Sequence, residues 1–287
     1  MLSAPKRQRN PDNVEGPWFV DDACIDCDAV RQLAPSLISR VDGKSVVVRQ
    51  PANDDDERAM WLAALACPTN SLRTDPPRPR PRGLYPLELG DDVWYCGHNA
   101  RSSFGANAYL VERRWGRAMI DAPRWHPDIV SWLEARGGLD HVLFTHRDDV
   151  ADGERYAEHF GARVWIHADD RSAAPGATNI IEDEATIEEG LVTVPVPGHT
   201  KGSVVFLLDD DALFTGDSLY WSRRRRDVGV FTGATWYSLE AQLDSLEHLA
   251  RRHRFAWLLP GHGQRHRTSA EDMPTRVLAM VDAMRNG

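Results

Sequence analysis

Four short apolar runs in the second half of the chain each end in a turn that carries side chains able to bind a metal ion. The turns contain Thr145–Asp152, Pro197–Thr200, Thr215–Asp217 and Pro260–Gly263. A short apolar run bounded by a turn is typical of a buried strand, so each ligand-type side chain is expected just beyond a strand end. Strand ends that meet at one edge would bring these side chains together. The spacing therefore predicts a sheet protein with a metal site at a sheet edge.

The candidate ligands are histidines and aspartates, which are usual ligands of zinc and non-haem iron. A single histidine in a turn is usually an ordinary surface residue, and His98, His126, His248, His253 and His266 are interpreted that way. His146, His199 and His262 differ, because each directly follows a predicted strand. The full candidate set is His146, Asp148, Asp152, His199, Asp217 and His262.

Composition excludes several classes of function. The formal net charge of −9 disfavours nucleic-acid binding, which requires a basic face. No run approaches the about 18 consecutive apolar residues of a membrane span. Met1–Asn10 is not followed by the apolar stretch of a secretory signal. We therefore expect no nucleic-acid or membrane partner and a cytoplasmic location.

A Pro-rich stretch divides the chain into two predicted domains. Residues 1–15 are polar and expected to be disordered. Residues 16–75 form a small unit, with a predicted strand at Ser45–Arg49 and a helix near Asp55–Ala66. Residues 76–83 are the stiff Pro-rich linker, and residues 84–287 form the larger domain.

Beyond the linker, predicted strands and helices alternate. Some strands are consecutive and others are separated by helices, which predicts two packed sheets with helices outside. Strands are predicted at Ala106–Val111, Ala118–Asp121, His141–Thr145, Val164–His167, Val192–Val196, Val204–Leu208, Ala212–Thr215 and Ala256–Pro260, and helices at Asp128–Arg136, Glu154–Phe160, Ser238–Arg252 and Ala270–Arg285.

The four turn motifs, in this order, resemble those of the metallo-β-lactamase-fold hydrolases, closest to glyoxalase II and to a subgroup fused to a ferredoxin. The motifs are Thr-His-Arg-Asp-Asp-Val-Ala-Asp from Thr145, Pro-Gly-His-Thr-Lys-Gly-Ser from Pro197, Phe-Thr-Gly-Asp from Phe214 and Pro-Gly-His-Gly from Pro260. The resemblance covers about residues 84–287. It implies an α+β fold, namely a four-layer αβ/βα sandwich with the site at one edge between the two sheets.

The resemblance also implies a ligand set. The family's His-x-His-x-Asp-His motif falls on His146, Asp148, Asp152 and Gly153, with two extra residues between its second and third members. His146, Asp148 and His199 would bind the first metal, Asp217 would bridge, and Asp152 and His262 would serve the second.

Gly153 stands where the family has a histidine, which predicts a weakened second metal site. His159 is six residues further on, about 9 Å along a helix, and is too far away to substitute. His167 ends the next predicted strand and stays open as a substitute.

Three functions follow from this set. The first is metal-dependent hydrolysis of a thioester or ester by metal-bound hydroxide, with one or two zinc ions and with Asp152 as the catalytic residue that orients the nucleophile or accepts a proton. The second is a mononuclear iron oxidoreductase similar to the persulfide dioxygenases, because His146, His199 and Asp217 form a two-His-one-carboxylate set. The third is a binding protein with a degraded metal site. We expect the hydrolase because most of the ligand set is present.

The cysteines of the small unit resemble those of a single-cluster bacterial ferredoxin domain. Cys24, Cys27 and Cys67-Pro68 match its motif between about Phe19 and Arg73, and Val30 stands at the place of the third cysteine. Three thiolates leave open an iron–sulfur cluster with fewer or foreign ligands, a zinc or redox thiol site, and a ferredoxin-shaped scaffold with no cluster. A bound cluster would imply a redox partner. Cys96 is interpreted as a separate thiol.

The segment Ser218–Tyr237 follows Asp217 and is rich in aromatic residues and arginines. Such a loop beside a metal could form a wall for a small-molecule substrate, and Arg223–Arg226 would suit an anionic one. The alternative interpretation is a solvated basic turn with a few core aromatic residues.

Overall fold

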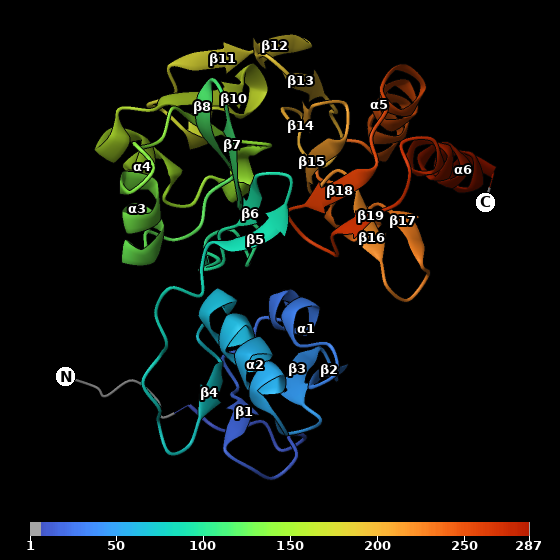
Figure 1. The fold of residues 1–287 in the computed structure, drawn as a ribbon. Helices are drawn as coiled ribbons and strands as arrows, with labels where there is room; N and C mark the ends of the chain where they lie inside the picture. Colours follow the sequence, from blue (N-terminus) through green and yellow to red (C-terminus); the bar gives the residue numbers. More distant parts are fainter. Residues whose placement is uncertain (1–6, 287) are drawn as a thin grey trace.

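The computed structural model describes residues 7–286, which form two facing sheets with helices outside and a small unit below them (Figure 1). In the small unit the elements are β1 (Trp18–Val20), α1 (Ala29–Leu33), β2 (Ile38–Val41), β3 (Lys44–Val47), α2 (Asp54–Ala66) and β4 (Leu72–Thr74). Among the described residues, no helix is both long and apolar enough to cross a membrane.

The first sheet has seven strands in the order β11-β10-β9-β8-β7-β6-β5. Its strands β8 to β11 are parallel, whereas β5 to β8 are antiparallel. The elements are β5 (Leu87–Gly90), β6 (Val93–Tyr95), β7 (Tyr109–Arg113), β8 (Gly116–Ile120), α3 (Pro127–Glu134), β9 (His141–Leu143), the 3-10 turn η1 (Arg147–Asp149), α4 (Gly153–Phe160), β10 (Arg163–His167), the 3-10 turn η2 (Ala168–Ala173) and β11 (Asn179–Ile181).

The second sheet has six strands in the order β12-β13-β14-β15-β18-β19. The pair β15 and β18 is parallel and its other pairs are antiparallel. The elements are β12 (Ala185–Glu188), β13 (Leu191–Pro195), β14 (Val204–Leu208), β15 (Ala212–Gly216), β16 (Tyr220–Ser222), β17 (Asp227–Gly229), η3 (Thr232–Ala234), α5 (Leu239–Arg252), β18 (Trp257–Pro260), β19 (His266–Arg267) and α6 (Asp272–Asn286).

Strand β14 shows why the sequence folds into layers. All five of its residues are buried and apolar, and successive side chains of a strand point to opposite faces. Phe206 and Leu208 therefore join the core between the sheets, while Val205 and Leu207 pack under α5 and α6. This gives the helix–sheet–sheet–helix sandwich that the motif resemblance implied.

The small unit has a core of its own, to which Cys24, Val30 and Cys67 belong. Helix α2 begins at Asn53, whose side chain accepts a hydrogen bond from the Asp56 amide, a usual N-cap. At its other end, Leu65 and Ala66 belong to the core of the larger domain. The domain boundaries of the sequence interpretation stay a prediction.

The disorder expected for residues 1–15 does not hold for the part that the structure describes. The Asn10 amide donates to the Val20 carbonyl, and the Asn13 side chain accepts from the Val20 and Val47 amides. These contacts hold residues 8–15 against β1 and β3. Residues 1–6 lie outside the described residues.

Candidate metal centre

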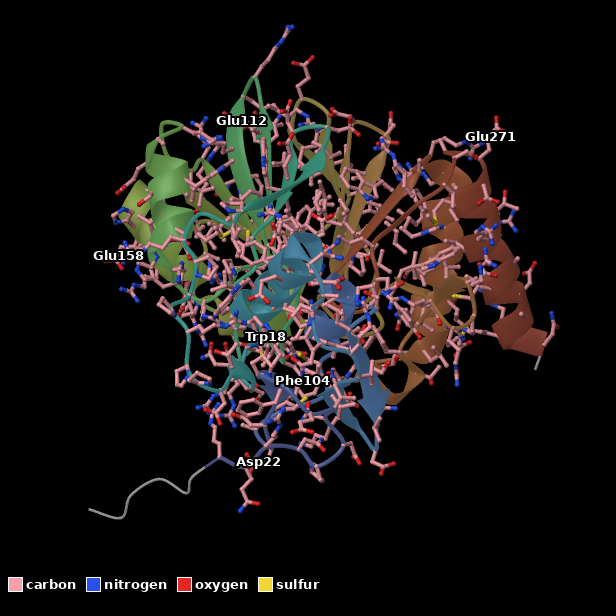
Figure 2. The ribbon with its side chains drawn as sticks, turned by 60° about the horizontal axis from the view of Figure 1, so that its bottom comes forward. Trp18, Asp22, Phe104, Glu112, Glu158 and Glu271 are labelled. Atoms are coloured by element: carbon pink, nitrogen blue, oxygen red, sulfur yellow. The ribbon has the colours of Figure 1, made fainter. Side chains whose placement is uncertain are left out.

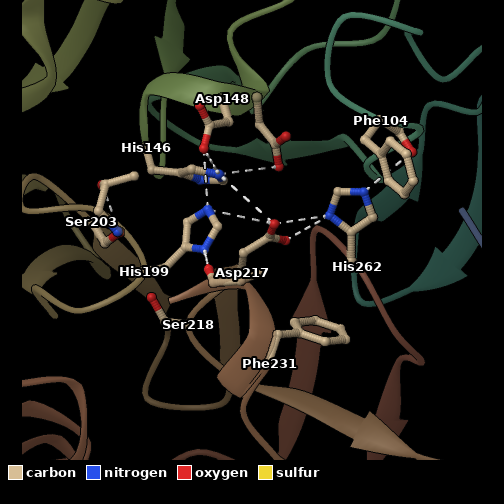
Figure 3. Close-up of polar contacts among 12 residues, drawn as sticks. Phe104, His146, Asp148, His199, Ser203, Asp217, Ser218, Phe231 and His262 are labelled. Atoms are coloured by element: carbon tan, nitrogen blue, oxygen red, sulfur yellow. Dashed lines mark hydrogen bonds and ion pairs between the residues drawn. The ribbon is translucent and has the colours of Figure 1, made fainter. Parts of the chain in front are cut away.

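The motif turns come together, and Figure 3 shows that the side chains of His146, His199 and Asp217 point toward one another. The Nε2 atom of His146 lies 4.0 Å from a carboxylate oxygen of each of three aspartates, Asp148, Asp149 and Asp217. His199 Nε2 lies 3.3 Å from Asp148 Oδ2 and 3.7 Å from Asp217 Oδ2. Two ligand atoms that each bind one zinc ion at about 2.1 Å lie about 3.4 Å apart in a tetrahedral site. These side chains can therefore share an ion with small shifts.

Several atoms of the site lack the partners that buried polar atoms normally have. His146 Nε2, His199 Nε2 and both carboxylate oxygens of Asp149 are buried and accept or donate no hydrogen bond within residues 7–286. Two overlapping groups of ligand atoms each lie within 4.8 Å of one another: His146, Asp148 and His199, and His146, Asp149 and Asp217. Unpartnered nitrogens and oxygens directed at the same point fit a bound cation.

Hydrogen bonds to the other ring nitrogens set the two histidine tautomers. The Thr145 hydroxyl donates to Asp121, and its oxygen lies 2.9 Å from His146 Nδ1, from which it can accept. His199 Nδ1 donates to the Ala234 carbonyl. Each ring thus has its proton on Nδ1 and a free lone pair on Nε2. This is how buried carboxylates and carbonyls orient metal-binding histidines.

His262 contacts a single member of the group. Its Nδ1 lies 2.8 and 3.0 Å from the two oxygens of Asp217, and its Nε2 lies 3.4 Å from the Phe104 carbonyl. His262 therefore lies beside Asp217, on the side away from His199.

Electrostatics agree with a cation site. Burial, followed by the charges of Asp217 and Asp121, raises the pKa of Asp149 well above its usual range. Burial also raises the pKa of Asp121 to about 8 and lowers the pKa of His146 to about 4. The pKa of Asp217 is lowered, because the effect of His262 and the other histidines outweighs its burial. The carboxylates therefore repel one another, and a bound cation would relieve that repulsion.

Two glycines in the motifs are required by close approach. A Cβ on Gly216, whose φ is +48°, would lie 2.3 Å from Thr145 Oγ1, and one on Gly261 would lie 2.8 Å from Asp149 Oδ2. Side chains at these positions would displace the histidine support or the carboxylate. The Thr-Gly-Asp and Pro-Gly-His sequences therefore have a packing reason as well as a ligand.

Asp149 was missed by the sequence interpretation, which assigned the role to Asp152. The structure does not bring Asp152 to the site, because its carboxylate accepts a hydrogen bond of 2.6 Å from the Trp125 amide. The chain forms the 3-10 turn η1 directly after His146, and this turn directs Asp149 inward. The adjacent Asp148–Asp149 pair was the available sequence signal.

The sequence predicted that Gly153 occupies a metal-ligand position from which the histidine is missing, and the structure places this residue elsewhere. It is the first residue of α4, and a Cβ there would lie 2.5 Å from the ring of Phe144 and 3.1 Å from the Ala122 Cβ. A histidine at this position would therefore enter the core. His159 lies near Glu134, and His167 Nδ1 accepts from the Asp169 amide, so neither replaces a ligand.

Asp170, which the sequence interpretation also missed, joins two of the motif turns. This buried carboxylate accepts from the Arg147 amide and from the Thr200 hydroxyl. It thereby fixes η1 relative to the turn that carries His199. The sequence interpretation had no signal for it, because Asp170 lies in an unremarkable turn, η2.

The site opens into a cavity of about 1070 Å³. The segment expected to be a long loop contains the β16–β17 hairpin and η3, and it contributes Tyr220, Trp221, Arg223, Phe231 and Trp236 to the lining. Phe104 also lines the cavity, and it is labelled in Figure 2, where the bottom of the molecule comes forward. Of the run Arg223–Arg226, only Arg223 belongs to the lining of the cavity.

The cysteine unit does not fit a four-cysteine cluster. Val30 is buried beside Cys24, Cys27 and Cys67, and the space that they line is about 10 Å³, room for about one water. Backbone amides of Ser45 and Ser71 donate to the Cys24 and Cys67 sulfurs. Iron–sulfur clusters of this kind are usually held by four thiolates. The three cysteines and the small space between them therefore do not fit such a cluster.

The surface interpretation of His98 is wrong, because His98 is fully buried. Its ring stacks on His126 with centroids 3.5 Å apart and contacts the Tyr85 ring edge to face. Neither of its nitrogens has a hydrogen-bond partner within the part of the chain that the structure describes. Cys96, which was interpreted only as a separate thiol, is also buried.

Comparison with solved structures confirms the fold. A metallo-β-lactamase from Pontibacter korlensis superposes with a TM-score of 0.52 at 17% identity, over 68% of this chain and 97% of that one. The metallo-β-lactamase FIM-1 from Pseudomonas aeruginosa, in its mono-zinc form, superposes with a TM-score of 0.52 at 18% identity, over 69% and 94%. The larger domain has the metallo-β-lactamase fold.

Sequence comparison finds hydroxyacylglutathione hydrolases. The relative from Acidiphilium cryptum is 34% identical over 119 residues, which are 39% of this chain and 49% of the relative. The relative from Methylococcus capsulatus is 37% identical over 122 residues, 39% of this chain and 46% of the relative. The chain thus spans about half the length of these relatives. Hydroxyacylglutathione hydrolase is another name for glyoxalase II, the group that the turn motifs resemble most closely.

A family model confirms the likeness of the small unit. Residues 20–74 match the model described as the 4Fe-4S single cluster domain of ferredoxin I. The chain therefore joins a ferredoxin-like unit to a metallo-β-lactamase-fold domain.

Proposed function

We propose that this protein is a metal-dependent hydrolase of thioesters. The observation that carries the proposal is the set of unpartnered nitrogens and carboxylate oxygens at the floor of a large cavity. The name of the relatives, hydroxyacylglutathione hydrolase, supports a hydroxyacyl thioester of glutathione as the substrate class.

The proposed ligands are His146, Asp148 and His199 for one ion, with Asp149 and Asp217 toward a second position and His262 beside it. A bound zinc or iron ion would supply a water activated for attack at neutral pH and would polarise the scissile carbonyl. The Asp149 carboxylate accepts no hydrogen bond within residues 7–286 and is therefore placed to orient that water or hold its proton.

Side chains around the ligands would bind and shield the substrate. Phe231, Trp236 and Phe104 line the cavity and can exclude water from the acyl group. Arg223 has no acidic partner among the described side chains and could bind an anionic group. The leaving thiol needs little assistance from a proton donor, because its ordinary pKa is about 8.5.

A matched pair of aspartate variants tests the proposal. Asp149→Asn should lower thioester hydrolysis by about a hundredfold or more and reduce zinc per chain, because it removes a ligand charge. Asp152→Asn should retain zinc and most activity, because its carboxylate supports the Trp125 amide. Hydrolysis rates, unfolding midpoints and elemental analysis are measured together. Equal losses of zinc in both variants would contradict the assignment of Asp149.

Metal analysis of the wild-type protein separates the alternatives. Two zinc ions per chain support hydrolysis. One iron without acid-labile sulfide would instead favour the mononuclear set of His146, His199 and Asp217. Absence of bound metal, together with full activity of a His199→Ala variant, would refute the proposed site.

A further inference from the structure

The cavity above the candidate metal centre is shared by both units of the chain. Its floor contains His199, Asp217 and their neighbours, whereas Pro35, Ser39 and Arg40 of the ferredoxin-like unit lie on its lining as well. Its volume of about 1070 Å³ is at the upper end of about 300–1,000 Å³ for small-molecule sites. The cavity therefore has room for much more than an acyl group.

The ferredoxin-like unit is held firmly in this position. The guanidinium of Arg124, in the larger domain, donates to the Leu65 carbonyl at 2.9 Å and the Cys67 carbonyl at 3.3 Å, where α2 ends. The Tyr85 hydroxyl donates to the Leu62 carbonyl at 2.9 Å. A cation at a helix C-terminus is favourable because the last carbonyls lack helical partners. The wall of the cavity is therefore preformed.

A loop of the larger domain lies between this unit and the candidate site. A Cβ on Gly105 would lie 2.8 Å from the Cys27 sulfur, so backbone and thiol are in close contact. The preceding Phe104 carbonyl lies 3.4 Å from His262 Nε2. Ser103 lines the cavity and is buried, and its hydroxyl has no hydrogen-bond partner within residues 7–286. A buried hydroxyl without a partner at a cavity wall indicates a polar ligand.

The wall carries exposed polar side chains beside Pro35. Ser39 and Arg40 lie on β2, are exposed, and belong to the lining of the cavity. Asp26 accepts from the guanidiniums of both Arg40 and Arg31, which fixes the position of this corner. Arg40 keeps a largely free surface, since its side chain is 63% exposed. The wall can therefore offer hydroxyl and guanidinium donors to a carboxylate-bearing ligand.

We infer that the ferredoxin-like unit is the outer wall of the substrate site, where Ser39, Arg40 and Ser103 bind the part of the thiol moiety that is remote from the scissile bond. This rests on the proposed thioester hydrolysis for the chemistry of the ligand. The unit thus selects substrates with a long, carboxylate-bearing thiol moiety. Its role here needs no electron transfer.

Binding of two thioethers that cannot be hydrolysed tests this inference. S-methylglutathione is a tripeptide thioether with two carboxylates, whereas S-methylcysteine is a single amino acid with one. Their dissociation constants are measured by the fluorescence of Trp221 and Trp236, which line the cavity. The wild-type protein should bind S-methylglutathione about tenfold more tightly or better, as expected for a charge-assisted hydrogen bond.

Two wall variants have matched controls on the same unit. Ser39→Trp places a bulky ring at the wall and Arg40→Ala removes the guanidinium donor, and each should reduce the preference for S-methylglutathione to about twofold or less. Ser36→Trp and Arg49→Ala are the controls, because Ser36 and Arg49 are exposed, contact each other, and do not line the cavity. The controls should keep the wild-type preference.

The inference is overturned if the wild-type protein binds both thioethers equally, or if the wall variants keep the preference. It is also overturned if the controls lose the preference equally, because the effect would then be structural. Thioester turnover by wild-type protein is measured separately. Absence of turnover with an intact, wall-dependent binding preference would refute the hydrolase proposal alone.

Discussion

For the variant Gly153→His, the family motif and the structure predict opposite results. By alignment with the family motif, Gly153→His would restore a missing ligand, and the protein should gain zinc. In the structure the first atom of the new side chain would lie 2.5 Å from two carbons of the Phe144 ring. Carbon atoms in contact are normally about 3.5–4.0 Å apart. The ring, which is fully buried, would have to shift by about 1 Å.

The expected cost follows from that overlap. Overpacking of a core by a methyl group typically costs about 1–3 kcal/mol, whereas replacing a helical glycine gains at most about 1 kcal/mol. Gly153→Ala should therefore be destabilised by up to about 2 kcal/mol, and Gly153→His by more because its ring is larger. A loss of about 2 kcal/mol lowers the Tm of a domain of this size by about 4–8 °C.

Thermal unfolding and elemental analysis give the result. Gly233→Ala is the control, because no atom lies within 4 Å of a Cβ at that position. We expect both Gly153 variants to melt below wild type and below the control, with zinc per chain unchanged. A Gly153→His protein that binds an additional zinc ion at undiminished stability would refute the structural reasoning.

Three further predictions concern the supports of the site and a buried histidine. Thr145→Val removes the acceptor of His146 Nδ1 and should weaken zinc binding about 10–100-fold, measured by competition with a chromophoric chelator; equal affinity would show that the hydroxyl does not orient the ring. Burial lowers the pKa of His98 to about 2, so the folded protein keeps it neutral while the unfolded chain protonates near its usual pKa of about 6.5. Stability from this group is thus complete above about pH 6.5 and declines at lower pH, by about 1.4 kcal/mol between pH 7.5 and 5.5; urea unfolding of a His98→Asn variant should lack that increment, and an identical pH dependence in both proteins would contradict it. Removal of metal by a chelator should lower the Tm, because an ion at a thousand times its Kd stabilises the folded state by about 4 kcal/mol; a Tm that is independent of added zinc would show that no ion binds the folded site.

Strong local patterns could be interpreted without tertiary information. The β14 run was predicted over Val204–Leu208 and has those bounds, because five consecutive apolar residues suit a strand covered on both faces. Helix α5 was predicted from its leucine spacing and spans Leu239–Arg252. The motif turns were recognised because each ligand directly follows an apolar run, and a glycine stands immediately before His199, Asp217 and His262.

Weakly patterned elements were missed. Strands β5 and β6 are only four and three residues long, and β5 is an edge strand with no fully buried residue. The hairpin β16–β17 lies in a segment expected to be a loop, because its arginines mask the short apolar pairs. Elements stabilised mainly by neighbouring strands carry little signal of their own.

The amino-acid sequence by itself determined the class of fold, the ferredoxin-like unit, and the expectation that His146, His199 and Asp217 lie close together. These follow from local periodicity and from motifs that resemble those of known families. Only the tertiary structure decided that Asp149 enters the site while Asp152 supports Trp125, and that Gly153 lies against Phe144. The physical reason is that a single turn, η1, rotates the following side chains, and no pattern in the sequence specifies that rotation.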